Sequence, residues 1–86
     1  MKKKILIADD DKSLVGILKD RLQYEGFGVM VAYEGQMTLD VVKKKKPDLI
    51  LLDLWMPAGT GLTVLQELRS KPDTESIPVI ILTAVE

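Results

Sequence analysis

Three aspartates in this chain follow runs of apolar residues, at the points where buried strands would end. Asp9 and Asp10 come after the apolar residues 5–8, and Asp53 comes after residues 49–52. Carboxylates that gather at one place repel each other, and a hard divalent cation such as Mg²⁺ removes that cost. An aspartate beside such a cation can also attack phosphorus and become an acyl phosphate. Each acid alone could equally cap its own strand, so the elements that carry the acids decide whether they meet.

Composition narrows the classes of protein that these acids could serve. The chain has 86 residues, enough for one small domain, and 47% of them are hydrophobic, as in globular proteins. Cysteine and histidine are absent, which excludes disulfides, thiolate nucleophiles, imidazole bases and zinc held by Cys or His. The formal net charge of −1 gives no global attraction to nucleic acid or to a membrane. No apolar run is long enough for a signal peptide or a membrane-spanning helix, so we expect a cytoplasmic protein.

Strands and helices are expected to alternate along the whole chain. Short apolar runs predict strands over 3–8, 27–32, 49–53 and 77–82. Apolar residues three or four positions apart predict helices over 11–25, 36–46, and from the glycine-containing loop 57–61 to about residue 70. This βαβαβαβ order predicts an α/β fold with an open parallel sheet and helices on both faces. In the flavodoxin-like strand order 2-1-3-4, the first and third strands are neighbours.

The helices should pack through their apolar residues and end at recognisable signals. The expected inward-facing residues are Leu14, Val15, Ile17, Leu18, Leu22 and Tyr24 in the first helix, Met37, Val41 and Val42 in the second, and Leu62, Leu65 and Leu68 in the third. Asp11 is expected to cap the first helix and Gly26 to end it. Lysines 43–46 complement the negative end of the second helix, which Pro47 then stops. We prefer this interpretation of the lysines to nucleic-acid binding.

The predicted topology brings the acids to one place. The C-terminal ends of parallel strands lie along one edge of a sheet, so Asp9, Asp10 and Asp53 should converge there. Thr83 follows the fourth strand and could hydrogen-bond a phosphoryl oxygen, or could satisfy local backbone instead. The turn after the first strand has no glycine and does not fit a dinucleotide. The residues therefore indicate a Mg²⁺-dependent phosphoacceptor site centred on Asp53.

Three segments together resemble one family. Residues 5–11 (ILIADDD), 47–57 (PDLILLDLWMP) and 77–84 (IPVIILTA) are similar, in order and spacing, to the receiver domain of bacterial response regulators. The resemblance covers essentially the whole chain. It implies a flavodoxin-like fold and a signalling function, not an enzymatic one, in which a sensor histidine kinase donates a phosphoryl group.

The resemblance also implies a role for individual residues. Position by position, Asp53 matches the phosphoacceptor, Asp10 the direct Mg²⁺ ligand, Asp9 a ligand through water, Trp55 a ligand through its backbone carbonyl, Thr83 the switch hydroxyl and Ala84 a backbone amide that donates to the phosphoryl group. The indole of Trp55 would border the acyl phosphate, and we expect it to slow attack by water.

The chain departs from the family pattern in its length. Receivers have five strands and five helices, so residues 1–86 match a single incomplete receiver domain without the last strand and two helices. The lysine that pairs with the phosphoryl group has no counterpart, and nothing places Lys12 or Lys71 at the site. We therefore expect impaired phosphorylation and switching. We also expect an exposed fourth strand or bare sheet face, through which the chain forms a homodimer or a swapped assembly.

Two other functions stay open. One is a structural fragment or self-assembling building block without activity. The other is an aspartyl-phosphate hydrolase, which needs a second acid two residues after the nucleophile, where this chain has Trp55. Neither a nucleic acid nor a membrane is expected as a partner of this segment.

Overall fold

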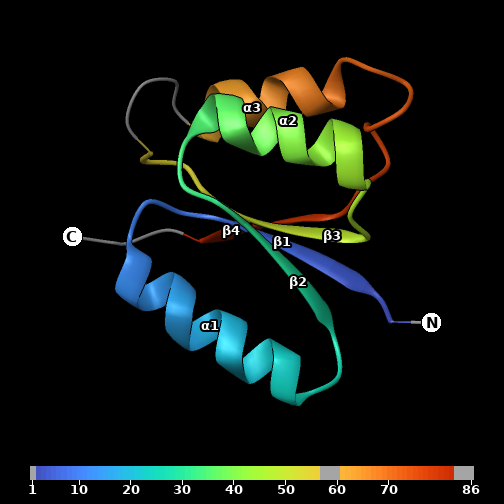
Figure 1. Ribbon diagram of the computed structural model, residues 1–86. Helices are drawn as coiled ribbons and strands as arrows, with labels where there is room; N and C mark the ends of the chain where they lie inside the picture. The colour runs from blue at the N-terminus through green and yellow to red at the C-terminus, as the bar shows by residue number, and fades with distance from the viewer. Residues whose placement is uncertain (1, 57–60, 83–86) are drawn as a thin grey trace.

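The computed structural model describes residues 2–56 and 61–82. Its elements are β1 (Lys4–Ala8), α1 (Lys12–Tyr24), β2 (Gly28–Ala32), α2 (Gly35–Lys45), β3 (Leu49–Asp53), α3 (Gly61–Arg69) and β4 (Val79–Leu82). The strands form one parallel sheet in the order β2-β1-β3-β4. Helix α1 covers one face of the sheet, and α2 and α3 cover the other (Figure 1). The predicted fold class and strand order are confirmed.

The central strand β1 is buried by both helical layers. Leu6 and Ala8 belong to a cluster of buried residues that reaches α2 and α3 through Val42 and Val64. Ile5 and Ile7 are also buried and, because side chains alternate along a strand, point to the opposite face, where α1 lies. Burial of each large side chain stabilises the fold by about 1.5–3 kcal/mol. The acid that follows β1 is therefore attached to a strand that is buried on both faces.

Helix α1 buries a narrower face than its sequence pattern predicts. Val15 is buried, but Ile17 is 68% exposed and Tyr24 is 84% exposed. The prediction that both face inward is wrong, and Leu14 is partly exposed as well. The reason is geometric: α1 packs mainly against β2, an edge strand of the described sheet, so only a narrow strip of its apolar surface meets the sheet.

The inward residues of α2 and α3 also differ from the prediction. Met37 and Leu62 are exposed, whereas Thr38 and Val64 are buried. The hydroxyl of Thr38 donates to the backbone oxygen of Glu34 at 2.7 Å, which satisfies this polar group inside the core. In each helix, more than one set of residues has the three- and four-residue spacing of a buried face. The packing of α2 and α3 against each other and the sheet decides which set is buried.

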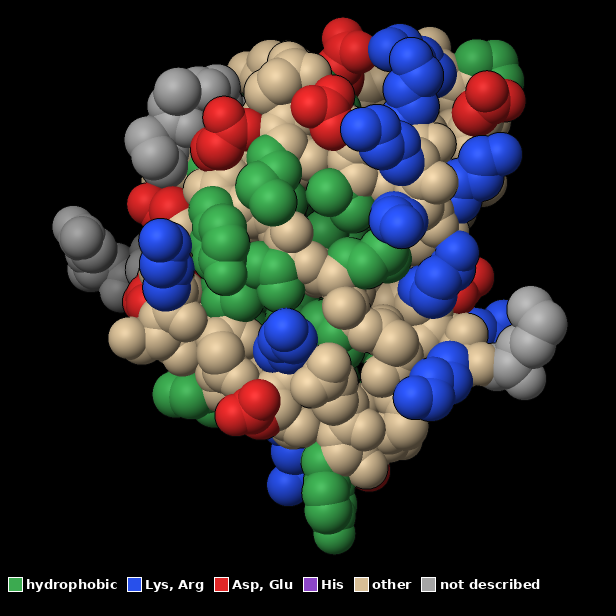
Figure 2. All heavy atoms as spheres, viewed as in Figure 1, with side chains coloured by type: hydrophobic (Ala, Val, Ile, Leu, Met, Phe, Trp, Pro, Cys, Tyr) green, Lys and Arg blue, Asp and Glu red, His purple; other side chains and the backbone are tan. Residues whose placement is uncertain are grey.

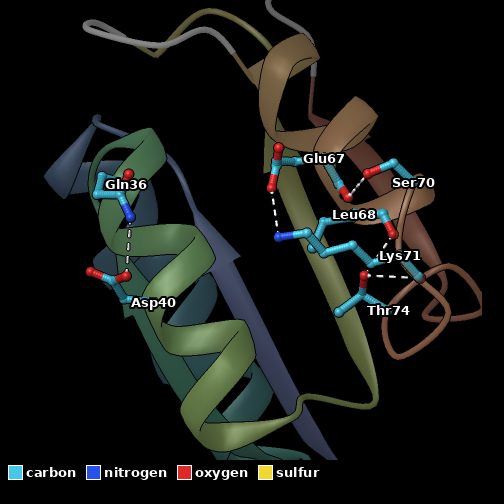
Figure 3. Close-up of polar contacts among 7 residues, drawn as sticks. All are labelled: Gln36, Asp40, Glu67, Leu68, Ser70, Lys71 and Thr74. Atoms are coloured by element: carbon cyan, nitrogen blue, oxygen red, sulfur yellow. Dashed lines mark hydrogen bonds and ion pairs between the residues drawn. The ribbon is translucent and has the colours of Figure 1, made fainter.

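The helix ends follow the predicted signals. Asp11 caps α1 by accepting the Leu14 amide at 3.1 Å, and Gly26 follows the helix with a φ of +98°. After α3, the Thr74 hydroxyl donates to the Leu68 carbonyl at 2.6 Å (Figure 3). Arg69 donates to the backbone oxygen of Ile77 at 2.8 Å. These bonds fix the connection that leads into β4.

Strand β4 is an edge of the described sheet, because it pairs only with β3 there. Ile80 is 52% exposed and Ile81 is 36% exposed. The expected exposed fourth strand is thus present. Within the described residues, no helix has both the length and the apolar character needed to cross a membrane.

Candidate functional site

The register of β1 and β3 brings the acids together. Ala8 pairs with Leu52, so the next residues, Asp9 and Asp53, end their strands side by side. The Asp9 amide donates to the Ala32 carbonyl at 3.0 Å, which continues the pairing of β1 with β2 by one residue. Carboxylate oxygens of Asp9, Asp10 and Asp53 all lie within 4.8 Å of one another. The predicted convergence of the three acids is confirmed.

Two of these acids are held by the turns that follow them. Asp9 Oδ1 accepts the Asp11 amide at 2.9 Å, and Asp53 Oδ1 accepts the Trp55 amide at 3.0 Å. Both bonds are Asx-turns, in which a side chain folds the backbone two residues further on. An ionised carboxylate offers about four acceptor positions, so each acid keeps capacity for a cation. The acids are therefore fixed by local structure and can still bind a ligand.

The electrostatics of the cluster favour a bound cation. Asp9 is only 4% exposed, and this burial raises the pKa of its carboxyl. The amide of Asp11 acts in the opposite direction, while the negative charges of Asp53, Asp10 and Asp11 raise the pKa further. Asp10 is exposed, so the cluster is open to solvent on its side. A bound cation would offset both the cost of keeping the buried Asp9 carboxylate charged and its repulsion by the neighbouring acids.

The acids open into a cleft of about 610 Å³ with apolar walls. Its lining consists of Asp9, Asp10, Asp11, Leu14, Asp53, Trp55, Ile81 and Leu82. The donor set is entirely carboxylate oxygen, which suits Mg²⁺ and not a soft metal. Two ligands of one Mg²⁺ lie up to about 4 Å apart, so small rotations or a bridging water would let these acids share an ion.

Lys12 and Lys71, the two lysines considered above as possible partners of the phosphoryl group, make contacts elsewhere. Lys12 Nζ lies 5.3 Å from the centre of the Tyr33 ring, a cation–π contact. Lys71 Nζ pairs with Glu67 at 2.8 Å (Figure 3). Within the described residues, the cleft is lined by no lysine. The printed contacts of Lys12 and Lys71 thus lie outside the lining of the cleft.

Gly61 contributes to the site in a way that the sequence reading missed. It is the first residue of α3, not part of the preceding loop, and its amide donates to the Leu54 carbonyl at 3.0 Å. A Cβ atom here would lie 2.1 Å from the backbone oxygen of Asp53. Only glycine allows the helix to begin against the backbone of the acid-bearing strand. The only indication in the sequence was a glycine next to the expected start of the helix, and a glycine there is also typical of a loop.

Some predicted site residues cannot be placed. Thr83 and Ala84 lie outside the described residues, so their roles stay predictions. Trp55 is placed on the cleft wall with a side chain that is 69% exposed. The proposed use of its backbone carbonyl as a metal ligand also stays a prediction.

Comparison with known proteins identifies the family. A sequence model of the response regulator receiver domain matches residues 5–86, nearly the entire chain. The chain belongs to the response regulator receiver domain family. The expected resemblance is therefore confirmed, and the acidic cleft lies in a receiver fold.

Solved receivers have the same fold. The N-terminal domain of a response regulator receiver protein from Methanoculleus marisnigri JR1 is 33% identical, with a TM-score of 0.92 over 95% of this chain and 67% of that one. Vibrio cholerae chemotaxis protein CheY4 is 28% identical, with a TM-score of 0.93 over 100% of this chain and 72% of that one. The phosphorylated cyanobacterial phytochrome response regulator RcpA is 29% identical, with a TM-score of 0.92 over 99% and 67%. The receiver described here thus spans about two thirds to three quarters of the length of these structures.

Proposed function

We propose that this receiver accepts a phosphoryl group on Asp53 from a sensor histidine kinase in the presence of Mg²⁺. The observation that carries the proposal is the convergence of three carboxylates within 4.8 Å at the C-terminal edge of the sheet. Asp10 and Asp53 would hold the ion directly, Asp9 would hold it through water, and Trp55 would add its backbone carbonyl. The ion would neutralise charge on the phosphoryl oxygens.

The chain's own residues prepare Asp53 for this transfer. The Trp55 amide orients the carboxylate of Asp53. Asp53 is only 9% exposed, and it lines the cleft, which is the route by which a phosphoryl donor would reach it. In the transfer, a carboxylate oxygen forms a bond to phosphorus while the bond from phosphorus to the kinase's histidine nitrogen breaks. Thr83 and the Ala84 amide would then bind the phosphoryl oxygens. The phosphorylated form of RcpA supports this chemistry in a similar receiver.

We expect slower transfer to Asp53 than in a receiver whose cleft holds a phosphoryl-pairing lysine. The described lining of the cleft contains no lysine to pair with the phosphoryl group. The described lining therefore lacks one cation that would stabilise the negative charge developing in the transition state. We expect Asp53 to be phosphorylated more slowly as a result.

The test is phosphorylation by a small donor. The protein is incubated with Mg²⁺ and acetyl phosphate, and its intact mass is followed with time. We expect the mass of one phosphoryl group to be added in the wild type and in Asp20→Asn, an exposed acid on α1, but not in Asp53→Asn. Absence of any gain, or a gain that persists in Asp53→Asn, would contradict the proposal.

A second candidate function is self-association through β4. Ile80 is 52% exposed on the edge strand and shares a sheet face with its partner Leu51, on the side where α1 packs against β2, the other edge strand of the described sheet. An exposed edge of this kind can pair with another chain. Light scattering at tens of micromolar should give a dimer that Ile80→Lys dissociates and Ile17→Lys, at an exposed isoleucine of α1, does not. A monomeric wild type would exclude this function.

A further inference from the structure

Lysines gather along the edge of the sheet opposite the acidic cleft. Two runs supply them, Lys2–Lys4 before and at the start of β1 and Lys43–Lys46 at the end of α2. The fold joins these distant runs, because Lys4 Nζ donates to the Lys45 carbonyl at 2.6 Å. The Lys4 backbone also bonds Asp48 in both directions, at 2.7 and 2.8 Å. Figure 2 shows most of the basic side chains visible in that view on the side where the chain begins.

We call these seven lysines the lysine edge; the ammonium group of one of them, Lys4, is partly engaged by the Lys45 carbonyl. All of them are exposed. The ion pairs found among the described residues are Arg21–Glu25 and Lys71–Glu67, and neither involves the lysine edge. The nearest acid in sequence, Asp48, accepts a backbone amide of β1 with its side chain. Asp40, Glu67 and Asp73 line the same hollow as Lys43 and Lys46 and offset part of this positive charge, so the edge has an excess of positive charge and is not free of acids.

The acids at the other edge are too far away to cancel it. β1 and β3 each contain 5 residues, which separates the two edges by roughly 17 Å. The Debye length at physiological ionic strength is about 8 Å. The net charge of −1 therefore sums charges spread over the whole surface, in which the acids of the cleft and the lysine edge lie apart.

The lysines of α2 surround the end of that helix. Consecutive residues of a helix point about 100° apart, so Lys43–Lys45 fan out around the end of α2. Lys46 follows in the left-handed conformation, with a φ of 49°. A fan of this kind spreads the positive charge over the whole end of α2, where Lys43 and Lys46 also border a hollow that they share with Glu67 and Asp73. The seven positions are all lysine, with none of the planar guanidinium groups that read nucleic-acid bases.

We propose that the lysine edge binds the surface of an anionic phospholipid bilayer. The ammonium groups would lie among lipid phosphates and carboxylates, and the binding would be peripheral and sensitive to salt. The acidic cleft, at the opposite edge of the sheet, would then point away from the bilayer and stay accessible. This inference does not rest on phosphorylation of Asp53.

The test is co-sedimentation of the full chain with vesicles of phosphatidylcholine, with and without phosphatidylserine. We expect binding only to the vesicles that contain phosphatidylserine, and its loss at high salt. Each lysine near an anionic surface contributes about a fivefold gain in affinity, so Lys43→Gln/Lys44→Gln/Lys46→Gln should bind roughly a hundredfold more weakly. The same three positions changed to arginine should retain binding.

A matched control separates the lysine edge from net charge. Lys12→Gln/Arg21→Gln/Lys19→Gln, at exposed positions on α1, has the same net charge and should bind nearly as the wild type does. Asp53→Asn should also bind as the wild type does, which keeps this test independent of phosphorylation. Equal weakening in both triple variants, or no binding of the wild type, would overturn the proposal. Retention on duplex DNA without binding to anionic vesicles would overturn it as well and would assign the edge to nucleic acid.

Discussion

The two edges of the sheet carry opposite charge and are built in different ways. At the C-terminal edge, Asp9 and Asp53 are buried, oriented by backbone amides, and within 4.8 Å of Asp10. At the N-terminal edge, the lysines are exposed, and among the described residues none is in an ion pair. Covalent chemistry needs groups held in fixed positions and partly shielded from water. Binding to an extended charged surface needs only a high local density of charge. The comparison therefore supports two separate proposals, covalent chemistry at the acidic edge and association at the basic edge.

The largest expected effect tests whether the acidic edge is tightly built. Gly61→Ala places a methyl group 2.1 Å from the Asp53 carbonyl, so α3 or β3 must shift. We expect the free energy of unfolding to fall by about 3 kcal/mol or more, measured by urea denaturation. Gly16→Ala is the matched control, because its Cβ meets nothing within 4 Å and alanine favours the helix, by about 0.5–1 kcal/mol. If the two substitutions changed the free energy of unfolding equally, the start of α3 would not be closely packed against the backbone of Asp53.

The next prediction concerns where Mg²⁺ binds. Asp10→Asn should weaken Mg²⁺ binding by at least about tenfold, since even residues behind the direct ligands typically contribute that much. Trp55 is the one tryptophan of the chain and lines the cleft, so its fluorescence reports the titration. The Lys43→Gln/Lys44→Gln/Lys46→Gln variant should bind Mg²⁺ as the wild type does. A comparable loss in that variant would mean that the two edges are not independent.

A smaller effect is expected from the indole beside the acceptor. Trp55→Ala should shorten the lifetime of the acyl phosphate several-fold, because the bulky side chain on the cleft wall restricts the approach of water. Loss of phosphate from the purified phosphorylated protein, followed by intact mass, measures this lifetime. An unchanged lifetime would remove the indole from the mechanism while leaving the phosphoacceptor in place.

The smallest effect concerns the cost of burying Asp9. Its pKa in the folded protein is raised above the ordinary value of 3.8, so the folded state binds this proton more tightly than the unfolded state does. The free energy of unfolding should therefore fall as the pH rises from about 3.8 through the folded pKa. Without Mg²⁺, Asp9→Asn should raise stability at neutral pH by roughly 0.5–2 kcal/mol and give no gain at low pH. A gain that is the same at every pH would point to packing and not to charge.

The sequence was sufficient for the strands and for the meeting of the acids. The apolar run before Asp53 predicts a buried strand, and β3 has the predicted bounds. Once the strands are parallel and in the order 2-1-3-4, the positions of Asp9 and Asp53 follow from topology. Helix faces could not be predicted as well, because Met37 and Thr38 are adjacent and only the packing of α2 against the sheet and α3 shows which one is buried.

What the sequence alone determined is the type of chemistry: no histidine, no cysteine, and three aspartates at strand ends that favour a hard cation and a phosphoryl group. Only the tertiary structure decided the two features that depend on distant segments. It places the methylene of Gly61 against the Asp53 backbone, and it joins Lys4 to Lys45 in one basic edge. Composition sums charge over the whole chain, whereas screening in water limits each charge to its neighbourhood. The chain has a net charge close to zero, but its folded surface has one acidic edge and one basic edge.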